Sequence, residues 1–525
     1  MLRPGAWRAV VDRLQGVLVQ GSGGDDAGGE APTRREKRFV VALCALASIR
    51  VFLFSAAFPL FSNVDESAHF DLVSKYARGH VPAGLERRDA DAARLLVLLN
   101  TPEYLERSDA FPGGVYPPPH RIVTPEQRPA FEREVRRWVE LENHESTQPP
   151  LYYLVAAAWS LVGSAMGLAG GHGLYWIRFL DVILSALLTW LAYVVARRIF
   201  PNRPFPRVGV PLLIAFFPQD AMYLVNNDAF LPLTGGAAFL GLVLLLQGAR
   251  TSYAFHAWTG LLVAAAMLVK FSNVAVPIVC LGVVAYLVAV APTGKDRTSA
   301  LTKSAVLLGV ACVPIAAWCV RNYLLLGDAT GSLEKARFLD WTVKPLGAMP
   351  DHPIFTLRGL AFFWQETLAL FWRGEIVWGH RPLASPRWDF VYGVSSLVFV
   401  VVAVAASWTW RRDPRSTERS ALLTSAALFF LSLAFLAAIS VVYDFGTCIY
   451  PSRAVPYLIS GRLASGSLIP FAVLYLSGVD ALLPRRVPAP LRWACLIVPV
   501  AWMTVSEFIM STTVFASAYN WFHMP

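Results

Sequence analysis

The sequence predicts an all-α protein that crosses a membrane about eleven times, and three observations lead to that fold class. Hydrophobic residues make up 55% of the 525 positions and charged residues only 16%, with a mean hydropathy of +0.48, which is too apolar for a soluble protein of several domains. Apolar runs near the roughly 18 to 20 residues that span a bilayer recur along the chain. Basic residues gather between these runs, so the net charge of +10 marks membrane topology rather than nucleic-acid binding.

The chain begins with a polar segment, residues 1–38, that is expected to be a cytoplasmic tail because Arg34, Arg35, Lys37 and Arg38 end it. A membrane module is expected over 39–320, including a large external loop at 62–173 with helices that lie along the membrane. A second external loop is expected at 321–390 and a C-terminal transmembrane module at 391–525. The expected spans lie near 39–61, 174–196, 208–224, 229–248, 257–268, 274–290, 305–320, 391–410, 422–442, 463–483 and 494–513.

The apolar run at 151–170 is the difficult case for this topology. If it crossed the membrane, the basic cluster from Arg197 to Arg207 would lie outside. If it lies at the interface as a juxtamembrane or re-entrant helix, that cluster and all later ones fall inside. The agreement of several clusters favours the interfacial helix, while the spanning alternative stays open.

A charged residue within the first span and the cysteines of the chain lead to two further expectations. Arg50 lies near the middle of the first span, where a charge costs about 2.5 to 3.5 kcal/mol, so we expect it to face protein or a water-filled cavity. The six cysteines are scattered, five of them in apolar runs, so neither a disulfide framework nor a paired-cysteine metal site is expected.

The stretch from Ser62 to Phe70 places two adjacent carboxylates, Asp65 and Glu66, just beyond the end of the first span. Membrane helices usually end in aromatic and basic residues, so acidic residues at this boundary need an explanation. One explanation is structural, with Asp65 or Ser62 capping a helix that runs through Phe70. The other is functional and depends on what lies nearby.

Further polar residues recur at the predicted outer ends of the spans, and each has a structural reading. Arg178 with Asp181 is interpreted as a structural pair, and the segment from Asn226 to Asp228 could be a turn and helix cap. Arg321 and Arg462 could be basic anchors at the membrane surface. Together, these residues describe a polar, mostly cationic cavity at the membrane boundary with a carboxylate pair at its edge.

Such a cavity suits the transfer of a sugar from a lipid phosphate. Fixed cations at headgroup depth can hold the phosphate and stabilise it as it leaves. A hydroxyl that attacks an anomeric carbon needs a base, and Asp65 is the candidate. The candidate residues for binding the donor phosphate are Arg321, Arg453, Arg462 and Lys270.

The motifs in this order resemble the GT-C superfamily of membrane glycosyltransferases, most closely a bacterial family of polytopic membrane proteins within it. The resemblance runs from about Arg38 to Phe471. Leu463 departs from it, because an aromatic residue is common at that position, and this weakens the assignment of Arg462. The motifs that carry the resemblance are Val64–Phe70 with Tyr76, Gly79 and Pro82, Gln148–Tyr153, Pro218–Gln219 with Asn226–Asp228, Leu268–Phe271, Arg321–Tyr323 with Gly327–Asp328, and Gly461–Leu463.

The resemblance implies an isoprenoid-linked sugar donor and an inverting, direct displacement. It matches Asp65 to the catalytic acidic residue and Glu66 to a second acidic position whose role varies. Some members use a divalent cation there, and Asp65 and His69, at i and i+4 of a helix, could share one or could simply belong to a capped, solvated helix start. The candidate substrate-binding residues are His69, Asn227, Asp228, Trp378 and His380.

The leading hypothesis is therefore a glycosyltransferase of the bacterial plasma membrane. It moves a sugar from a polyprenyl-phosphate donor to an extracytoplasmic glycan, lipid or protein, and its active site faces outward. A lipid or glycan transporter (a flippase) is the main alternative, and a scaffold for a wall-synthesis complex is a third possibility.

Overall fold

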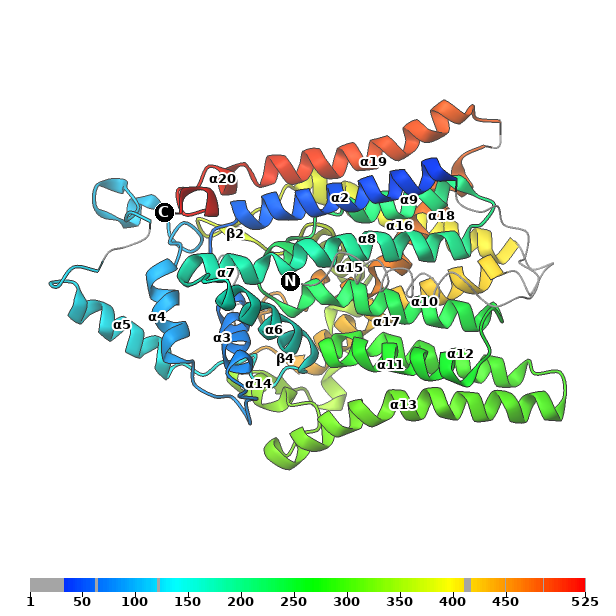
Figure 1. Ribbon diagram of the computed structural model, residues 1–525, viewed down its shortest axis with the longest axis horizontal. Coiled ribbons are helices and arrows are strands. Elements are labelled where there is room, and N and C mark those ends of the chain that lie inside the picture. Colours follow the sequence, from blue (N-terminus) through cyan, green and yellow to red (C-terminus); the bar gives the residue numbers. More distant parts are fainter. Residues whose placement is uncertain are drawn as a thin grey trace.

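A computed structural model describes residues 33–61, 65–119, 123–409, 417–448, 450–484 and 486–524 of the chain. Within these residues, nine helical segments are long and apolar enough to cross a membrane, and the long helices labelled in Figure 1 run side by side along the long axis of the molecule. The segments concerned are α2 (Arg34–Ala57), α7 with α8 (Gly170–Arg178 and Leu180–Ile199), the turn η4 (Asn227–Phe230) with α10 (Leu231–Leu246), the turn η5 (Phe271–Val274) with α12 (Ala275–Ala289), α13 (Gly294–Leu326), α16 (Pro386–Thr409), α17 (Thr417–Val442), the turn η8 (Gly461–Ser467) with α18 (Leu468–Leu482), and α19 (Ala489–Met510). The predicted fold class is confirmed.

Two of the eleven predicted spans fall on shorter helices. The prediction for 257–268 lies within α11 (Tyr253–Val269), which has 17 residues. The continuous span predicted at 208–224 is wrong, because α9 (Pro204–Ala215) ends after 12 residues and Asp220 already begins the 3-10 turn η3 (Asp220–Tyr223). Phe216, Phe217 and Pro218 follow α9, and Gln219 and Asp220 come next, so the continuation of the helix is an irregular segment that is mostly buried inside the protein.

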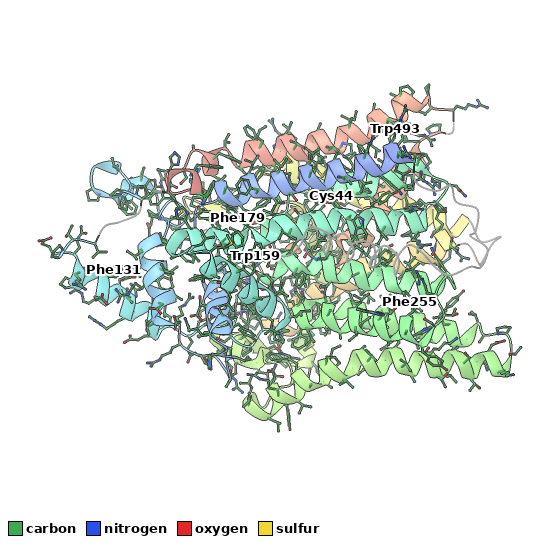
Figure 2. The ribbon with its side chains drawn as sticks, in the orientation of Figure 1. Cys44, Phe131, Trp159, Phe179, Phe255 and Trp493 are labelled. Atoms are coloured by element: carbon green, nitrogen blue, oxygen red, sulfur yellow. The ribbon has the colours of Figure 1, made fainter. Side chains whose placement is uncertain are left out.

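Short helices gather at one end of the bundle (Figure 1), and Figure 2 labels Phe131 at this end, with Phe255 and Trp493 toward the other. The apolar run at 151–170 contains α6, which has 15 residues, fewer than a straight span needs, and which packs against α3 and α7. The end helices are α3 (Glu66–Ala77), α4 (Ala90–Leu99), α5 (Arg128–Glu140), α6 (Leu151–Ala165), α14 (Ser332–Phe338), α20 (Thr512–Phe515), and the 3-10 turns η1 (Ser108–Ala110), η2 (Pro112–Gly114) and η9 (Trp521–His523).

The second predicted external loop is only partly peripheral. Its α15 (Leu357–Arg373) buries Phe371 and Trp372 against aromatic residues of the bundle, with Trp372 stacked on Tyr392 at a centroid distance of 4.7 Å. Short turns and two pairs of two-residue antiparallel strands complete this segment, and one of the pairs joins it to residues 443–444. They are β1 (Thr342–Val343) with β4 (Tyr443–Asp444), β2 (Val377–Trp378) with β3 (Arg381–Pro382), η6 (Leu346–Ala348) and η7 (Pro353–Phe355).

The buried apolar residues form a large core between the long helices and a smaller core that fixes the short ones. The smaller core packs Leu72 and Val73 of α3 against Tyr152 and Tyr153 of α6 and Tyr175 of α7. Since α3 begins immediately after Asp65, this packing sets the position of the two adjacent carboxylates relative to the bundle.

Arg50 faces protein, as expected from the cost of a charge within a span. Its guanidinium pairs with Glu507 of α19 at 2.9 Å and donates to the hydroxyl of Tyr223 at 2.5 Å. The carbonyl oxygens of Ala215 and Phe217, where α9 ends, accept further hydrogen bonds from it. Arg50 therefore satisfies the free carbonyls of the broken helix and fixes α2 to α19.

Candidate functional site

Asp65 lies at the N-terminal cap position of α3, but its carboxylate makes no capping hydrogen bond to the helix. Its Oδ2 instead accepts a hydrogen bond from Nη2 of Arg462, a residue almost 400 positions later in the sequence. The helix-cap explanation therefore does not account for this carboxylate. Ser62, the other candidate cap, lies outside the described residues.

Arg462 is the centre of the site. It lies in the 3-10 segment η8 (Gly461–Ser467), directly before α18, and only 11% of its side chain is exposed. Its three nitrogens meet three carboxylates: Nη2 meets Asp65, Nη1 donates to Asp228 at 2.8 Å, and Nε donates to Glu375 at 3.3 Å. Buried charges are expensive unless paired, so this hub holds three distant parts of the chain together.

A second cation, Lys270, completes this part of the site. Its ammonium donates to Asp228 Oδ1 at 2.6 Å, and the Asp228 carboxylate is fully buried between Lys270 and Arg462. Asp228 belongs to the 3-10 turn η4 (Asn227–Phe230), and Lys270 directly precedes η5 (Phe271–Val274). Both side chains thus project from turns that interrupt apolar segments.

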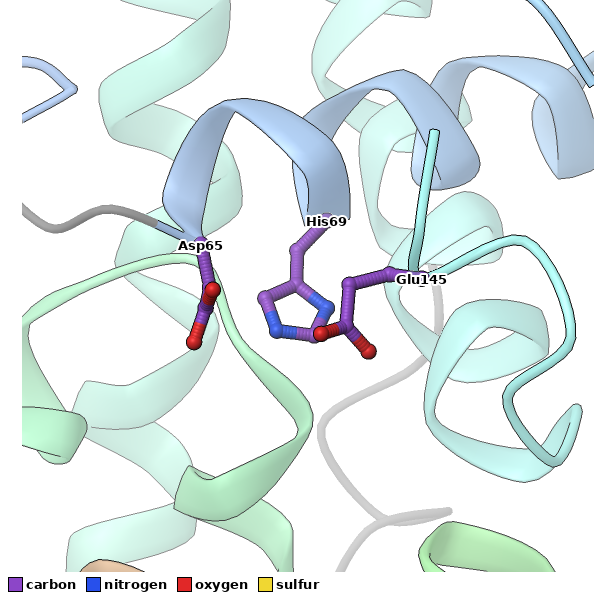
Figure 3. Close-up of side chains that lie close together, drawn as sticks. All are labelled: Asp65, His69 and Glu145. Atoms are coloured by element: carbon purple, nitrogen blue, oxygen red, sulfur yellow. The ribbon is translucent and has the colours of Figure 1, made fainter. Parts of the chain in front are cut away.

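On the other side of Asp65, the structure brings in His69, His144 and Glu145. Asp65, His69 and Glu145 each offer one atom that could bind a metal ion, and these three atoms lie within 4.8 Å of one another. Figure 3 shows the His69 ring between the two carboxylates. His144 Nε2 lies 3.4 Å from both Asp65 Oδ1 and Glu145 Oε1. Glu145 Oε1 also accepts from Lys335 of α14 at 2.5 Å.

Burial and neighbouring charges set the protonation of this group. Burial alone would raise the pKa of the Asp65 carboxyl, but Arg462 and the hydrogen bond from His144 hold that pKa well below its usual range. Burial also opposes ionisation of Glu145, yet Lys335 and His144 lower its pKa to about 2. Burial lowers the pKa of His69 to about 4, so its ring is neutral at physiological pH.

The cluster offers one nitrogen and two oxygens, a donor set that suits a divalent cation such as Mn²⁺ or Zn²⁺. Arg462 and Lys335 pair with Asp65 and Glu145, while His69 Nε2 and Glu145 Oε2 have no hydrogen-bond partner among the described residues and are available as ligands. These residues therefore fit a divalent cation, which Asp65, His69 and Glu145 would hold.

Several buried polar atoms around Arg462 lack a hydrogen-bond partner in the described part of the chain. Buried polar atoms are normally satisfied, so a group of unsatisfied atoms in one place indicates a polar ligand. Here the atoms are acceptors or ring nitrogens, which hydroxyl groups can satisfy. They are His69 Nε2, Glu145 Oε2, Asn227 Oδ1, Glu375 Oε1 and Asp220 Oδ1.

Asp220 lies behind Glu375, and burial raises its pKa to about 7. Its Oδ2 accepts the backbone N–H of Glu375 at 2.8 Å. Gly374 makes this approach possible, because its φ is 84° and a side chain there would collide with the Asp220 carboxylate. The glycine thus lets the loop after α15 bring Glu375 to Arg462.

Glu66 has a different role from its neighbour Asp65. Its two oxygens accept from Nε and Nη2 of Arg178 at 2.6 and 2.7 Å, and both side chains are buried. Backbone N–H groups of Phe61 and Val225 donate to the same carboxylate. Glu66 therefore lies in a saturated structural pair, and the pairing of Arg178 with Asp181 expected from the sequence is wrong because Glu66 occupies its guanidinium.

Two of the cations predicted to bind the donor phosphate lie away from Arg462. Arg321 donates to the carbonyl oxygens of Val81 and Pro82, and exposed Arg453 pairs with Asp444 at 2.8 Å. Neither contacts the Arg462 hub, so of the four cations assigned to the donor phosphate the structure brings together only Arg462 and Lys270.

Some of the predicted substrate-binding residues lie near Arg462 and others lie away from it. Asn227 is buried next to Asp228, and its Nδ2 lies 3.4 Å from Gln148 Oε1. Trp378 packs edge-on against Tyr104, and exposed His380 lies 3.9 Å from Glu106. Glu106 lines a cavity of about 480 Å³ between the first external loop and the C-terminal segment.

Sequence reasoning missed His144, Glu145, Lys335 and Glu375. His144 and Glu145 lie four and three residues before the Gln148–Tyr153 motif, and this polar run directly before two prolines was the signal available. Lys335 and Glu375 belong to the second external segment, where nothing local in the sequence indicates their contacts with Glu145 and Arg462.

The fold and site define a polytopic, all-α membrane protein with a cluster of buried charges around Arg462. Residues 49–447 match the family described as "Predicted membrane protein (DUF2142)", and the chain belongs to that family. No curated protein matches the sequence.

Among solved structures, the chain is similar to the oligosaccharyltransferase of Archaeoglobus fulgidus in the apo form, with 12% identity and a TM-score of 0.48 over 93% of this chain and 57% of that one. It is also similar to ArnT from Cupriavidus metallidurans bound to undecaprenyl phosphate, with 14% identity and a TM-score of 0.45 over 91% of this chain and 65% of that one. The chain spans little more than half the length of the archaeal enzyme. Likeness at this level concerns the fold alone.

Proposed function

We propose that the protein is an inverting membrane glycosyltransferase that moves a sugar from a polyprenyl-phosphate donor to an acceptor hydroxyl. One observation carries the proposal: unsatisfied buried polar atoms surround a pair of buried cations and a carboxylate, all at one end of the bundle. The cations suit a phosphate, and the unsatisfied acceptors suit the hydroxyl groups of a sugar.

Arg462 and Lys270 are the residues that bind the donor phosphate in this proposal. A guanidinium can form two parallel hydrogen bonds to a phosphate, and Lys270 adds a second charge through the shared partner Asp228. As the bond between the anomeric carbon and the phosphate oxygen breaks, charge builds on the leaving phosphate. Cations fixed in advance stabilise that charge most in a site with little water.

Asp65 is the proposed base. The acceptor oxygen attacks the anomeric carbon from the face opposite the phosphate, its proton passes to Asp65, and the polyprenyl phosphate departs with the bonding electrons. One displacement inverts the anomeric centre. Glu145, His69 and Asn227, whose unsatisfied atoms line the same cluster, orient the sugar through its hydroxyl groups.

The reaction is proposed to occur on the extracytoplasmic side of a bacterial plasma membrane, with a cell-envelope glycan, lipid or protein as acceptor. Reporter fusions test the side. A reporter after Pro102 should be external and one after Asn202 cytoplasmic. An external signal at Asn202 would mean that the segment 151–170 spans the membrane.

A lipid or glycan transporter is the alternative class. Transport requires ionisable groups or helix breaks deep in the spans that change partners. Arg50, the deep charge identified from the sequence, is instead held by Glu507, Tyr223 and two backbone carbonyls. That arrangement is typical of a fixed structural contact, so the structure offers no specific support for transport.

The direct test uses the full chain in nanodiscs with a panel of undecaprenyl-phosphate-linked pentoses and hexoses. The proposal expects at least one donor to release undecaprenyl phosphate when an acceptor extract from a bacterial envelope is added. Tight binding of the lipid with vectorial movement of the intact donor across proteoliposomes, and no release, would favour the transporter.

A further inference from the structure

In the structure, the residue proposed as base and the proposed phosphate ligand are bonded to each other. Asp65 Oδ2 accepts from Arg462 Nη2, while Asp228 and Glu375 occupy the other two nitrogens of the guanidinium. A phosphate that arrives at Arg462 therefore meets three carboxylates at the same group. Like charges this close repel, so at least one carboxylate has to give way.

The three carboxylates are not equally able to leave. Asp228 is fully buried and held by Lys270 as well as by Arg462. The side chain of Asp65 is 17% exposed, and its other oxygen already lies 3.4 Å from His144 Nε2. Glu375 is similarly exposed at 16%, but in the described chain its Oε1 has no hydrogen-bond partner and is thus not held from the other side. Asp65 is therefore the carboxylate with a second partner ready.

His144 is positioned to hydrogen-bond the Asp65 carboxylate when that carboxylate leaves Arg462. Its ring stacks on Phe338 of α14 with centroids 5.7 Å apart and an interplanar angle of 17°, which fixes the plane of the imidazole. Only 14% of the side chain is exposed, and Nε2 faces both Asp65 and Glu145. A small rotation of the Asp65 side chain exchanges a bond to Arg462 for a shorter one to His144.

We propose that the donor phosphate replaces Asp65 at Arg462 and that His144 then holds Asp65 in position for catalysis. This inference rests on the proposed function and adds a resting contact and a positioning residue to it. In the resting site, the Asp65 carboxylate is hydrogen-bonded to Arg462. Donor binding separates the two, so the base is available only when a phosphate is present to leave.

The inference makes an unusual prediction about affinity, because removing an acidic residue should strengthen the binding of an anion. In the full chain in nanodiscs, Asp65→Asn should bind undecaprenyl phosphate about tenfold more tightly than the parent, the scale of one charge-assisted hydrogen bond that no longer has to be broken. Asp444→Asn, which removes the carboxylate from the exposed pair with Arg453, is the matched control and should leave the affinity unchanged.

Double variants separate this exchange from a general change in charge. Arg462→Met should remove the gain seen in Asp65→Asn, because the two residues act through one contact. His144→Phe should weaken lipid binding about three- to tenfold in the parent, since Asp65 then lacks its second partner. The same change should have no effect in the Asp65→Asn background, and His144→Gln should restore part of the loss.

The possible outcomes separate a failure of the proposed Asp65 exchange from a failure of the proposed glycosyltransferase function. If the parent binds undecaprenyl phosphate but Asp65→Asn binds it equally or less well, the exchange is overturned while the proposed function stands. Equal weakening by His144→Phe in both backgrounds would mean a merely structural role for His144 and would also overturn the exchange. If neither the parent nor any variant binds the lipid, the proposed function fails and the exchange fails with it.

Discussion

Asp65 and Glu66 are adjacent carboxylates at the start of one helix, yet they lie in two different environments. Every oxygen of Glu66 is satisfied by Arg178 and by two backbone N–H groups, and the pair is buried. Asp65 belongs to a cluster in which several buried atoms have no partner within the described residues. The comparison shows how a saturated network fixes a fold, whereas the cluster around Asp65 keeps buried atoms that can still form hydrogen bonds.

The largest effect expected from this comparison is on stability, at Glu66. Replacing it by Ala leaves the Arg178 guanidinium buried and unpaired, which typically costs about 3 to 5 kcal/mol. The free energy of unfolding of Glu66→Ala, measured in detergent, should fall by that amount. Glu132→Ala, which breaks the exposed pair with Arg94, is the control and should cost at most about 1 kcal/mol.

The next effect is on ligand binding, at the cations. Arg462→Met should weaken the binding of undecaprenyl phosphate by roughly 1.5 to 3 kcal/mol, the worth of a charge-assisted hydrogen bond. Arg321→Met and Arg453→Met should change it by less than about 0.5 kcal/mol, because both side chains are engaged elsewhere. Equal losses at all three positions would indicate a general electrostatic effect rather than a defined phosphate site.

An effect that depends on pH, and that is the smallest of the three within any one pH unit, is expected at Asp220. Burial raises its pKa from about 3.8 to about 7, so its contribution to stability is complete below pH 4 and is lost as the pH rises through 7. Asp220→Asn can still accept the Glu375 N–H and does not ionise. The stability of the variant relative to the parent should therefore increase between pH 4 and 7, by at most about 1.4 kcal/mol per pH unit. A difference that does not vary with pH would mean that Asp220 ionises normally.

The sequence predicted the fold class and most of the spans because apolar length and basic clusters are local signals. It failed at 208–224, where hydropathy was averaged across Pro218 and Asp220 although the helix ends at Ala215. The burial of α15 was also missed, since an amphipathic segment among basic residues reads as an external loop when its aromatic partners are distant in sequence.

The candidate site was predictable in part for a similar reason. Asp65, His69, Asp228, Lys270 and Arg462 are polar residues next to apolar runs, and the structure brings all five together. Which partner each carboxylate takes could not be read from spacing. The choice of Arg178 by Glu66 and of Arg462 by Asp65 follows from packing between segments that are more than 100 residues apart.

The central claim is that Asp65 serves the reaction and not the fold, and one measurement tests it directly. Asn keeps a side-chain oxygen that can accept from Arg462 Nη2 but cannot take up a proton at neutral pH. Purified Asp65→Asn should unfold at nearly the temperature of the parent, should bind undecaprenyl phosphate at least as tightly, and should transfer sugar at least about 100-fold more slowly. Transfer at nearly the parental rate by this variant would contradict the account and return Asp65 to a structural role.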